Sequence, residues 1–322
     1  MKRTSEYAAI AEAEIRAISL PKENLEGLYA PVEYGMQAGG KRLRPTLVLM
    51  TADAFGQNPE KALKPAVGIE MFHNFTLLHD DVMDKSALRR GRPTVHSKWD
   101  ENTAILSGDT MLTLATEYVA DVDDSILRPV LDTFNRQALR VYEGQRLDMD
   151  FENREEVGLE EYIEMIKAKT GALLGGAAKI GALIGGASKE DAERMYDFGV
   201  MLGVAFQIED DYLDTFGNAE TFGKPIGGDI NNNKMTFLMV KALSMGGANA
   251  EALKVAMKMP EGPTKVKTVT RIYEAMGMPA ISKAEAAAYS SKALTAIKKT
   301  SLSDEAREAY RKLIEKLIGR SK

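Results

Sequence analysis

Two copies of the acidic pattern Asp-Asp-x-x-Asp lie far apart in this sequence. They consist of Asp80, Asp81 and Asp84, and of Asp210, Asp211 and Asp214. At about 3.6 residues per turn, positions i, i+1 and i+4 fall on one side of a helix, so each copy projects three carboxylates together. Such a cluster in an apolar stretch is unfavourable unless a cation neutralises it. Hard divalent cations prefer oxygen ligands, so we expect the two triplets to bind Mg²⁺, which in turn would bind a polyanion such as a diphosphate.

Basic residues accompany both triplets. They are Lys41 and Arg44 within Gly39–Pro45, Arg89 and Arg90 after the first triplet, and Lys224 and Lys234 after the second. Guanidinium groups bind phosphate oxygens through two parallel hydrogen bonds. Taken alone, one acidic triplet or one basic cluster could equally be a solvated surface. Basic clusters beside acidic clusters in an acidic protein indicate a site that binds metal and phosphate together.

Helical periodicity runs through nearly the whole sequence. Met71, Phe75, Leu78 and Val82 form one apolar stripe at helical spacing, and the first triplet lies on another side of the same stretch. Sustained alternation of apolar and polar residues, which would indicate strands, is absent from the sequence. Helix-breaking loops are expected near Gly39, Gly91 and Pro260 and between residues 217 and 233. We therefore expect one all-α domain over residues 1–322.

The composition limits the classes of function. The chain has 322 residues, of which 44% are hydrophobic, so it can bury a sizeable core. It contains no cysteine, which excludes disulfides, thiolate zinc sites and cysteine nucleophiles. It contains only three histidines, which argues against a histidine-built transition-metal site. The net charge of −5 argues against nucleic acid as a partner. We expect neither a signal peptide nor a transmembrane segment, and a cytoplasmic location.

These motifs, in this order, resemble the trans-isoprenyl diphosphate synthase (polyprenyl synthetase) family. In the first half the resemblance rests on Gly39–Pro45, on Glu70–His73, on Leu77–Asp84, and on Arg89–Gly91. In the second half it rests on Gly144-Gln145-x-x-Asp148, Lys169-Thr170-Gly171, Phe206–Asp214, Gly223-Lys224 and Lys234-x-Thr236. The resemblance implies a single large helical bundle with a central cavity, the isoprenoid synthase type I fold.

The resemblance also implies a reaction. Three Mg²⁺ ions bridge the aspartate triplets to the diphosphate of an allylic substrate and let its carbon–oxygen bond ionise, a Lewis-acid role. The double bond of isopentenyl diphosphate then attacks head to tail, and a proton is lost to the departing diphosphate. By this resemblance Asp80, Asp84 and Asp210 are metal ligands, with Asp81, Asp211 and Asp214 supporting them or ligating through water.

Further site residues follow from the same resemblance. Those expected to bind the allylic diphosphate are Arg89, Lys169, Lys224 and Lys234, and those expected to bind isopentenyl diphosphate without metal are Lys41, Arg44, His73 and Arg90. Thr170 and Gln207 would direct oxygen dipoles toward the developing cation. His73 could instead be an ordinary structural histidine.

Product length depends on the residues that precede the first triplet. Phe75 and Thr76 stand five and four residues before Asp80, about 6–7.5 Å along a helix. A bulky ring at the first position resembles short-chain synthases, which favours geranylgeranyl diphosphate, with farnesyl diphosphate as the next candidate. Alternatively, Phe75 belongs to the core on the Met71 stripe.

Three other functions fit part of the pattern. A class I terpene cyclase shares an aspartate-rich helix but has no use for the basic pair Lys41 and Arg44. A phosphohydrolase built on His79-Asp80 gives no role to the second triplet. A non-catalytic subunit of a heteromeric prenyl synthase typically lacks one triplet, whereas both are intact here. The family resemblance implies a homodimer that acts on small isoprenyl diphosphates.

Overall fold

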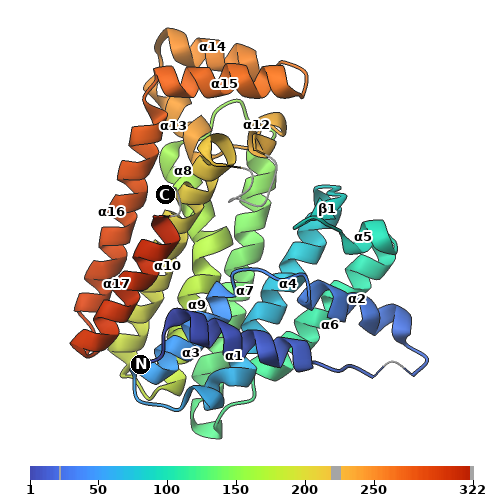
Figure 1. Cartoon of the computed structure of the whole chain (residues 1–322), viewed down its shortest axis with the longest axis vertical. Helices are drawn as coiled ribbons and strands as arrows, with labels where there is room; N and C mark the ends of the chain where they lie inside the picture. The colour runs from blue at the N-terminus through green and yellow to red at the C-terminus, as the bar shows by residue number, and fades with distance from the viewer. Residues whose placement is uncertain (22, 219–225, 320–322) are drawn as a thin grey trace. The chain divides into compact units, whose positions relative to one another are not determined.

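Helices make up nearly all regular structure in residues 1–21, 23–218 and 226–319, the part of the chain that this computed structural model describes (Figure 1). The all-α prediction is confirmed. The region around Gly91, expected to be a helix-breaking loop, contains the two-residue strands β1 (Leu88–Arg89) and β2 (Arg92–Pro93), which pair antiparallel. None of the helices in the described ranges combines the length and the apolar composition needed to cross a bilayer.

The chain divides into two compact units. Unit 1 comprises residues 1–136, 176–196 and 299–309, and unit 2 comprises residues 137–175, 197–298 and 310–322. Each unit therefore combines segments from distant parts of the sequence. The prediction of a single domain stays a prediction.

The first part of the chain, up to the middle of α7, supplies most of unit 1. Its helices are α1 (Thr4–Ala17), α2 (Glu26–Met36), α3 (Leu43–Ala54), η1 (Pro59–Ala62), α4 (Leu63–Met83), α5 (Val95–Lys98) and α6 (Glu101–Val119). Helices that contribute residues to both units are α7 (Asp124–Phe151), α9 (Ala172–Ile184), α10 (Lys189–Phe216) and α17 (Asp304–Ile318). The remaining elements belong to unit 2 and are α8 (Leu159–Ile166), η2 (Lys167–Gly171), α12 (Gly228–Asn231), α13 (Phe237–Met245), α14 (Gly247–Met257), α15 (Pro263–Ala275) and α16 (Met278–Lys298).

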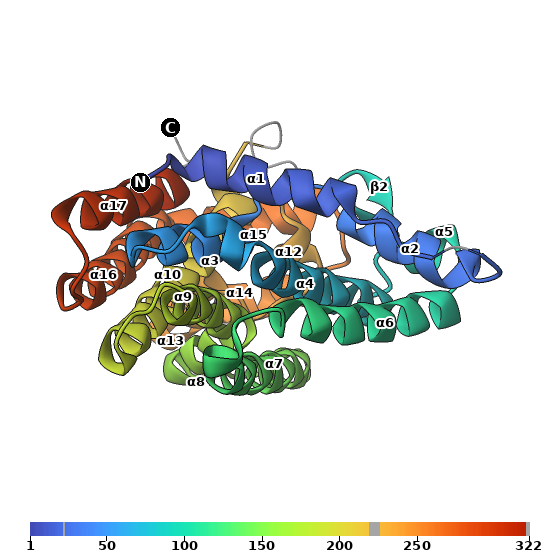
Figure 2. The same ribbon diagram turned by 90° about the horizontal axis from the view of Figure 1, so that it is seen from below.

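Unit 1 is organised around α4, which packs along α6 and against α3, while α1 covers α3 (Figure 2). Tyr7 of α1, Leu47 of α3, Phe72 of α4 and Met111 of α6 are all buried. Removing such side chains from water is the main favourable contribution to folding, about 1.5–3 kcal/mol for each large apolar side chain. This packing fixes α4, and with it the first aspartate triplet, within unit 1.

Unit 2 has its own apolar core. Phe151, Tyr162, Ile208, Phe237 and Tyr273 are buried together in it. Ile208 lies on α10 between Gln207 and the second triplet, so its burial holds this part of α10, and with it the triplet, against the core of unit 2. Tyr162 and Phe237 are near neighbours, with ring centroids 6.4 Å apart.

Candidate active site

The first triplet lies at the C-terminal end of α4. Asp80 and Asp81 belong to its last turn, and Asp84 is the C-cap residue, whose N–H donates to the carbonyl of Asp80 at 2.8 Å. The C-terminus of a helix carries the negative end of the helix dipole, so carboxylates are least favourable there. The helix thus gathers negative charge that only nearby cations can balance.

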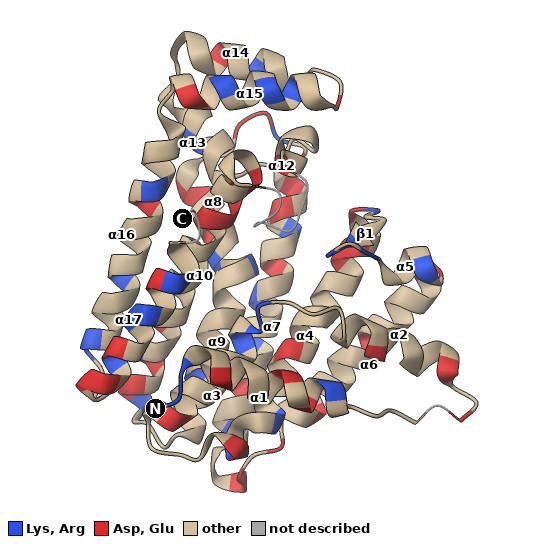
Figure 3. Cartoon of the chain, viewed as in Figure 1, with Lys and Arg blue, Asp and Glu red and all other residues tan. Residues whose placement is uncertain are grey.

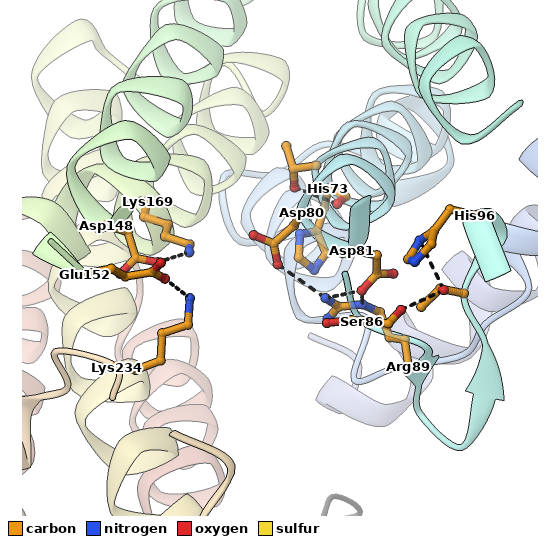
Figure 4. Close-up of polar contacts among 12 residues, drawn as sticks. His73, Asp80, Asp81, Ser86, Arg89, His96, Asp148, Glu152, Lys169 and Lys234 are labelled. Atoms are coloured by element: carbon orange, nitrogen blue, oxygen red, sulfur yellow. Dashed lines mark hydrogen bonds and ion pairs between the residues drawn. The ribbon is translucent and has the colours of Figure 1, made fainter. Parts of the chain in front are cut away.

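Arg89 supplies part of that balance. Its Nε donates to Oδ1 of Asp81 at 2.7 Å, and its Nη2 donates to Oδ2 of Asp80 at 3.3 Å (Figure 4). Figure 3 shows the acidic end of α4 beside the basic residues of the β1–β2 hairpin. Asp81 is only 4% exposed. Its burial raises the pKa of the carboxyl to about 6, although the nearby Arg89 acts to lower it.

The hairpin positions both arginines of the Arg-Arg-Gly motif. Arg90 and Gly91 form its two-residue turn with φ of 54° and 74°, and a type I′ turn needs positive φ at both of these positions. Two hydrogen bonds attach the hairpin to α2, from Tyr34 Oη to the carbonyl of Pro93 at 2.8 Å and from Arg92 Nη1 to the carbonyl of Gln37 at 3.0 Å. These hydrogen bonds fix the position of the turn, and with it Arg89 and Arg90, relative to the end of α2.

The residues expected to bind isopentenyl diphosphate gather in unit 1. The Nε of Arg44 is buried without a hydrogen-bond partner, and burial lowers the pKa of Arg44 to about 10. Burial, followed by the charges of Arg44 and Arg90, lowers the pKa of His73 well below its usual value, so the imidazole is neutral at pH 7. Lys41 is exposed and directly precedes Arg42, the N-cap residue of α3. An anion would satisfy the buried guanidinium N–H of Arg44.

The second triplet lies in the last two turns of α10, again at the negative end of a helix. Asp211 accepts three hydrogen bonds, from Tyr162 Oη at 2.5 Å, from the Phe237 N–H at 2.8 Å and from Gln207 Nε2 at 2.9 Å. Burial still dominates and raises the pKa of Asp211 to about 6, while the three donors act to lower it. Asp214 accepts from the Asp229 N–H at 3.0 Å. The triplet is thus tied to the segments that follow α10.

Lys169 and Thr170 lie in η2, a short π-helical segment between α8 and α9. π-Helical segments are rare overall, but those that occur are often found at functional sites. Gly144 of α7 contacts η2 so closely that a Cβ on Gly144 would lie 2.3 Å from the backbone nitrogen of Lys169. Thr170 Oγ1 donates to Gln207 Oε1 at 3.1 Å, which joins η2 to α10. Within unit 2 the structure therefore brings together Lys169, Thr170, Gln207 and Asp211.

Two lysines of unit 2 pair with carboxylates at the C-terminal end of α7, one in its last turn and one directly after it. Lys169 Nζ lies 2.5 Å from Oδ2 of Asp148, and Lys234 Nζ pairs with Oε1 of Glu152 (Figure 4). Asp148 was part of the motif found in the sequence, but Glu152 was missed. The available signal was its spacing of four residues from Asp148, since residues i and i+4 share a face of a helix, although α7 itself ends at Phe151. Lys224 lies outside the described residues.

Within residues 1–21, 23–218 and 226–319, no three His, Asp or Glu side chains converge as a complete cation cage. Mg²⁺ is commonly bound through one or two carboxylates together with water and substrate phosphates rather than by an all-protein cage. Carboxylate oxygens such as those of Asp80, Asp84 and Asp210, gathered at helix C-termini, have the chemistry this ion requires. Within each unit, the carboxylates of the triplet therefore have the oxygen chemistry that suits Mg²⁺.

The two positions expected to limit chain length lie one turn before the triplet on α4. Phe75 is buried, and its ring centroid lies 5.4 Å from that of Phe72 and 4.8 Å from that of His79. Thr76 is half-buried and its hydroxyl donates to the carbonyl of His73 at 2.8 Å. His79 itself forms a hydrogen bond with the carbonyl of Ile105 at 3.0 Å, a structural role between α4 and α6.

Comparison with known proteins places these features in a family. Residues 25–276 match the family described as polyprenyl synthetase. A geranylgeranyl diphosphate synthase of Methanosarcina mazei is 42% identical over 248 residues, 76% of this chain and 75% of the relative. A geranylfarnesyl diphosphate synthase of Natronomonas pharaonis is 41% identical over 245 residues, 70% of this chain and 72% of the relative. A crystal structure of a geranylgeranyl pyrophosphate synthase superposes with a TM-score of 0.95 at 40% identity and covers 100% of both chains.

Proposed function

The chain belongs to the polyprenyl synthetase family and is a prenyltransferase, and on this premise we propose that it condenses isopentenyl diphosphate with allylic diphosphates, head to tail and with Mg²⁺. The proposed product is a short all-trans chain, geranylgeranyl diphosphate first and farnesyl diphosphate next. The observation that carries this proposal is that each unit contains an aspartate triplet at a helix C-terminus together with cationic side chains. In unit 1 Arg89 bonds directly to Asp80 and Asp81, and in unit 2 the segment that carries Lys169 is joined to the helix of the second triplet through Thr170 and Gln207.

The allylic diphosphate is the substrate that needs the aspartates. Mg²⁺, when bound, neutralises the leaving diphosphate as a Lewis acid. We assign Asp80, Asp84 and Asp210 as ligands, with Asp81, Asp211 and Asp214 as supporting carboxylates. The basic residues assigned to the diphosphate oxygens are Arg89, Lys169, Lys224 and Lys234. The ion pairs of Lys169 with Asp148 and of Lys234 with Glu152 support these roles, because they hold the ammonium groups in place before substrate arrives.

Isopentenyl diphosphate is assigned to a different set of residues, Lys41, Arg44, His73 and Arg90. The buried, unsatisfied Nε of Arg44 supports this assignment, because a phosphate oxygen would accept its proton in a hydrogen bond. A neutral His73 contributes a hydrogen bond rather than a charge. This set contains no carboxylate ligand, in keeping with binding that needs no metal.

Thr170 and Gln207 are assigned to the developing allylic cation. Gln207 Nε2 donates to Asp211 and its Oε1 accepts from Thr170, so the amide has a fixed orientation. Oxygen dipoles that are already oriented stabilise a developing positive charge without reorganising during the reaction. Loss of a proton from the condensed cation to the departing diphosphate then completes the reaction.

Phe75 is assigned as the residue that limits product length. Its buried ring, packed against Phe72 and His79, supports a rigid obstacle rather than a mobile side chain. The names of the relatives in Methanosarcina mazei and Natronomonas pharaonis span two adjacent product lengths, so the exact length is open to direct measurement.

Product analysis tests the proposal directly. The purified protein would be incubated with isopentenyl diphosphate, Mg²⁺ and dimethylallyl, geranyl or farnesyl diphosphate in turn. Chain extension is expected, and the longest major product gives the chain length. No extension with any starter by folded protein would refute the proposal and favour the non-catalytic subunit. Diphosphate release without isopentenyl diphosphate would instead indicate a terpene cyclase.

A homodimer in the cytoplasm is part of the same proposal. Ile105 and Leu106 on α6 are large apolar side chains that are 45% and 58% exposed, which supports a subunit interface on that helix. The absence of cysteine agrees with a reducing compartment. Light scattering coupled to gel filtration would measure the oligomeric state, and a mass near 35.3 kDa would contradict the dimer.

A further inference from the structure

The loop between α2 and α3 has an unusual backbone. Gly39, Gly40 and Arg42 have φ of 76°, 130° and 46°, so Arg42 adopts the left-handed conformation as the N-cap residue of α3. This conformation is uncommon for residues other than glycine, asparagine and aspartate. A side chain that makes strong contacts can stabilise it.

Arg42 makes such contacts with three other segments of unit 1. Its Nη1 donates to Oε1 of Glu70 in α4 at 2.9 Å, and its Nε donates to Oε2 of Glu12 in α1 at 2.7 Å. Its Nη2 donates to the carbonyl of Met36, the last residue of α2, at 2.8 Å. Arg42 and Glu70 are each only 3% exposed. The planar guanidinium fork suits this three-way arrangement, whereas an ammonium group would not.

The Arg42–Glu70 pair joins the segments that carry the residues assigned to isopentenyl diphosphate. Lys41 precedes Arg42 directly and Arg44 follows two residues later. His73 follows Glu70 by three residues on α4, and so lies on the same face of that helix.

Arg90 of the hairpin contacts the loop between α2 and α3. Its Nη1 donates to the carbonyl of Gly39, and its guanidinium lies against Gly40, where a Cβ would approach Nη1 to 2.8 Å. The loop is thus held by Arg42 on one side and covered by Arg90 on the other.

Glu70 also matters for charge. Arg42, Arg44 and Arg90 lie close enough for their like charges to influence one another, and Glu70 favours the charged form of each. A buried carboxylate therefore allows several guanidinium groups to stay together before an anion arrives. Groups that are held in place in advance bind and orient a substrate without further ordering.

We propose that the buried Arg42–Glu70 ion pair is the positioning element of the isopentenyl diphosphate subsite, which fixes Lys41, Arg44 and His73 relative to one another without touching the substrate. This inference rests on the proposed function. It predicts that the pair serves binding geometry more than folding, because buried ion pairs can often be replaced by apolar residues with little loss of stability.

The test compares the double variant Arg42→Met/Glu70→Leu with Arg42→Lys and with the wild type. The double variant removes both charges and leaves Glu12 its ion pair with Arg16, at 2.8 Å. Arg42→Lys keeps the charge and loses the fork. The matched control is Arg128→Met, which removes an arginine that is 86% exposed and pairs with Asp132 on the surface of α7.

Steady-state kinetics would give KM separately for isopentenyl diphosphate and for the allylic diphosphate. Both pair variants should raise KM for isopentenyl diphosphate by about 10-fold or more, since misplacement by about 1 Å can cost about 100-fold. KM for the allylic substrate should change by less than about 3-fold, well under the tenfold that about 1.4 kcal/mol produces. Circular dichroism should show both variants folded, and Arg128→Met should behave as wild type.

Three results would overturn the inference. An unchanged KM for isopentenyl diphosphate in a folded Arg42→Lys variant would remove the positioning role, whether or not the double variant folds. An equal rise in both KM values would indicate a general structural effect. If the wild type and Arg128→Met do not condense the substrates at all, the proposed function fails and this inference fails with it.

Discussion

The hydrogen bond between Tyr162 and Asp211 offers a sharp test of how the second triplet is held. Tyr162 is 1% exposed, and its hydroxyl lies 2.5 Å from Oδ2 of the carboxylate. Burial and the adjacent carboxylate raise the pKa of Tyr162, so the hydroxyl keeps its proton and remains a donor. Tyr162→Phe removes this donor and almost nothing else. Asp211 would keep its bonds from Gln207 and Phe237.

The expected loss of stability follows from the charge on the acceptor. A hydrogen bond to a charged group contributes about 1.5–3 kcal/mol. For a chain of this length that corresponds to a Tm about 2–4 °C lower, measured by scanning calorimetry in EDTA at pH 7.5. Tyr273→Phe is the matched control, since Tyr273 is 1% exposed in the same unit and its hydroxyl bonds only to neutral groups that the structure describes, the thioether sulfur of Met239 at 3.6 Å and the side chain of Thr236. Its loss should cost about 1 kcal/mol, because neither partner is charged and a thioether is a weak acceptor.

The effect of Tyr162→Phe should also depend on pH. Burial raises the pKa of Asp211 from the ordinary aspartate value of 3.8 to about 6 in the folded protein, so the folded state takes up a proton as the pH falls through 6. Above pH 6 the buried carboxylate of Asp211 is ionised in the folded protein, which lowers the free energy of unfolding. The charge-assisted hydrogen bond from Tyr162 offsets part of this loss. At pH 5 the acceptor is neutral and the bond is weaker, so the Tm difference between Tyr162→Phe and wild type should narrow. Two results would refute this reasoning. One is a Tm loss in Tyr162→Phe no larger than that in Tyr273→Phe, and the other is a Tm loss in Tyr162→Phe that is the same at pH 7.5 and at pH 5.

Three further predictions address catalysis, product length and packing. Asp80→Ala should lower turnover by several orders of magnitude and weaken Mg²⁺-dependent binding of the allylic diphosphate; near-normal activity would reject Asp80 as a metal ligand. Phe75→Ala should lengthen the products, as measured by mass spectrometry, and lower the free energy of unfolding by about 3–5 kcal/mol. Unchanged products would show that Phe75 is only a core residue. Gly144→Ala should cost about 1–3 kcal/mol and raise KM for the allylic substrate, because its Cβ would meet the backbone of Lys169 at 2.3 Å. Gly27→Ala is its control, since a Cβ there meets nothing within 4 Å and alanine favours the helix, and an equal loss in both would contradict the close-packing argument.

The position of both triplets at helix C-termini is a feature that connects stability with function. Without a bound cation, a carboxylate at the negative end of a helix dipole destabilises the protein. The same carboxylate favours the binding of a cation at that position. The raised pKa values of Asp81 and Asp211 have a separate cause, burial, which also penalises the charge that the site needs. Such trade-offs between stability and activity are common at active sites.

The sequence by itself determined the features that depend on local spacing. The helical stretch before Asp80 and the loop near Gly39 could both be predicted, because helical periodicity and helix-breaking residues act over a few positions. The loop expected between residues 217 and 233 lies partly outside the described residues, and its described part contains the short helix α12. The family was also accessible, since its motifs are short and ordered along the chain. The sequence did not reveal the hairpin turn at Arg90, where both residues of a short turn must adopt positive φ.

Only the tertiary structure decided which side chains meet. Tyr162 lies 49 residues from Asp211, and Glu152 lies 82 residues from Lys234. Arg42 reaches Glu70 across 28 residues and Glu12 across 30. Such pairs depend on how helices pack in three dimensions, and no local pattern specifies them. The sequence therefore identifies the charged groups that can do chemistry, whereas tertiary packing determines which partners hold them in place. The physical reason is that a buried charge is strongly unfavourable unless a partner compensates it.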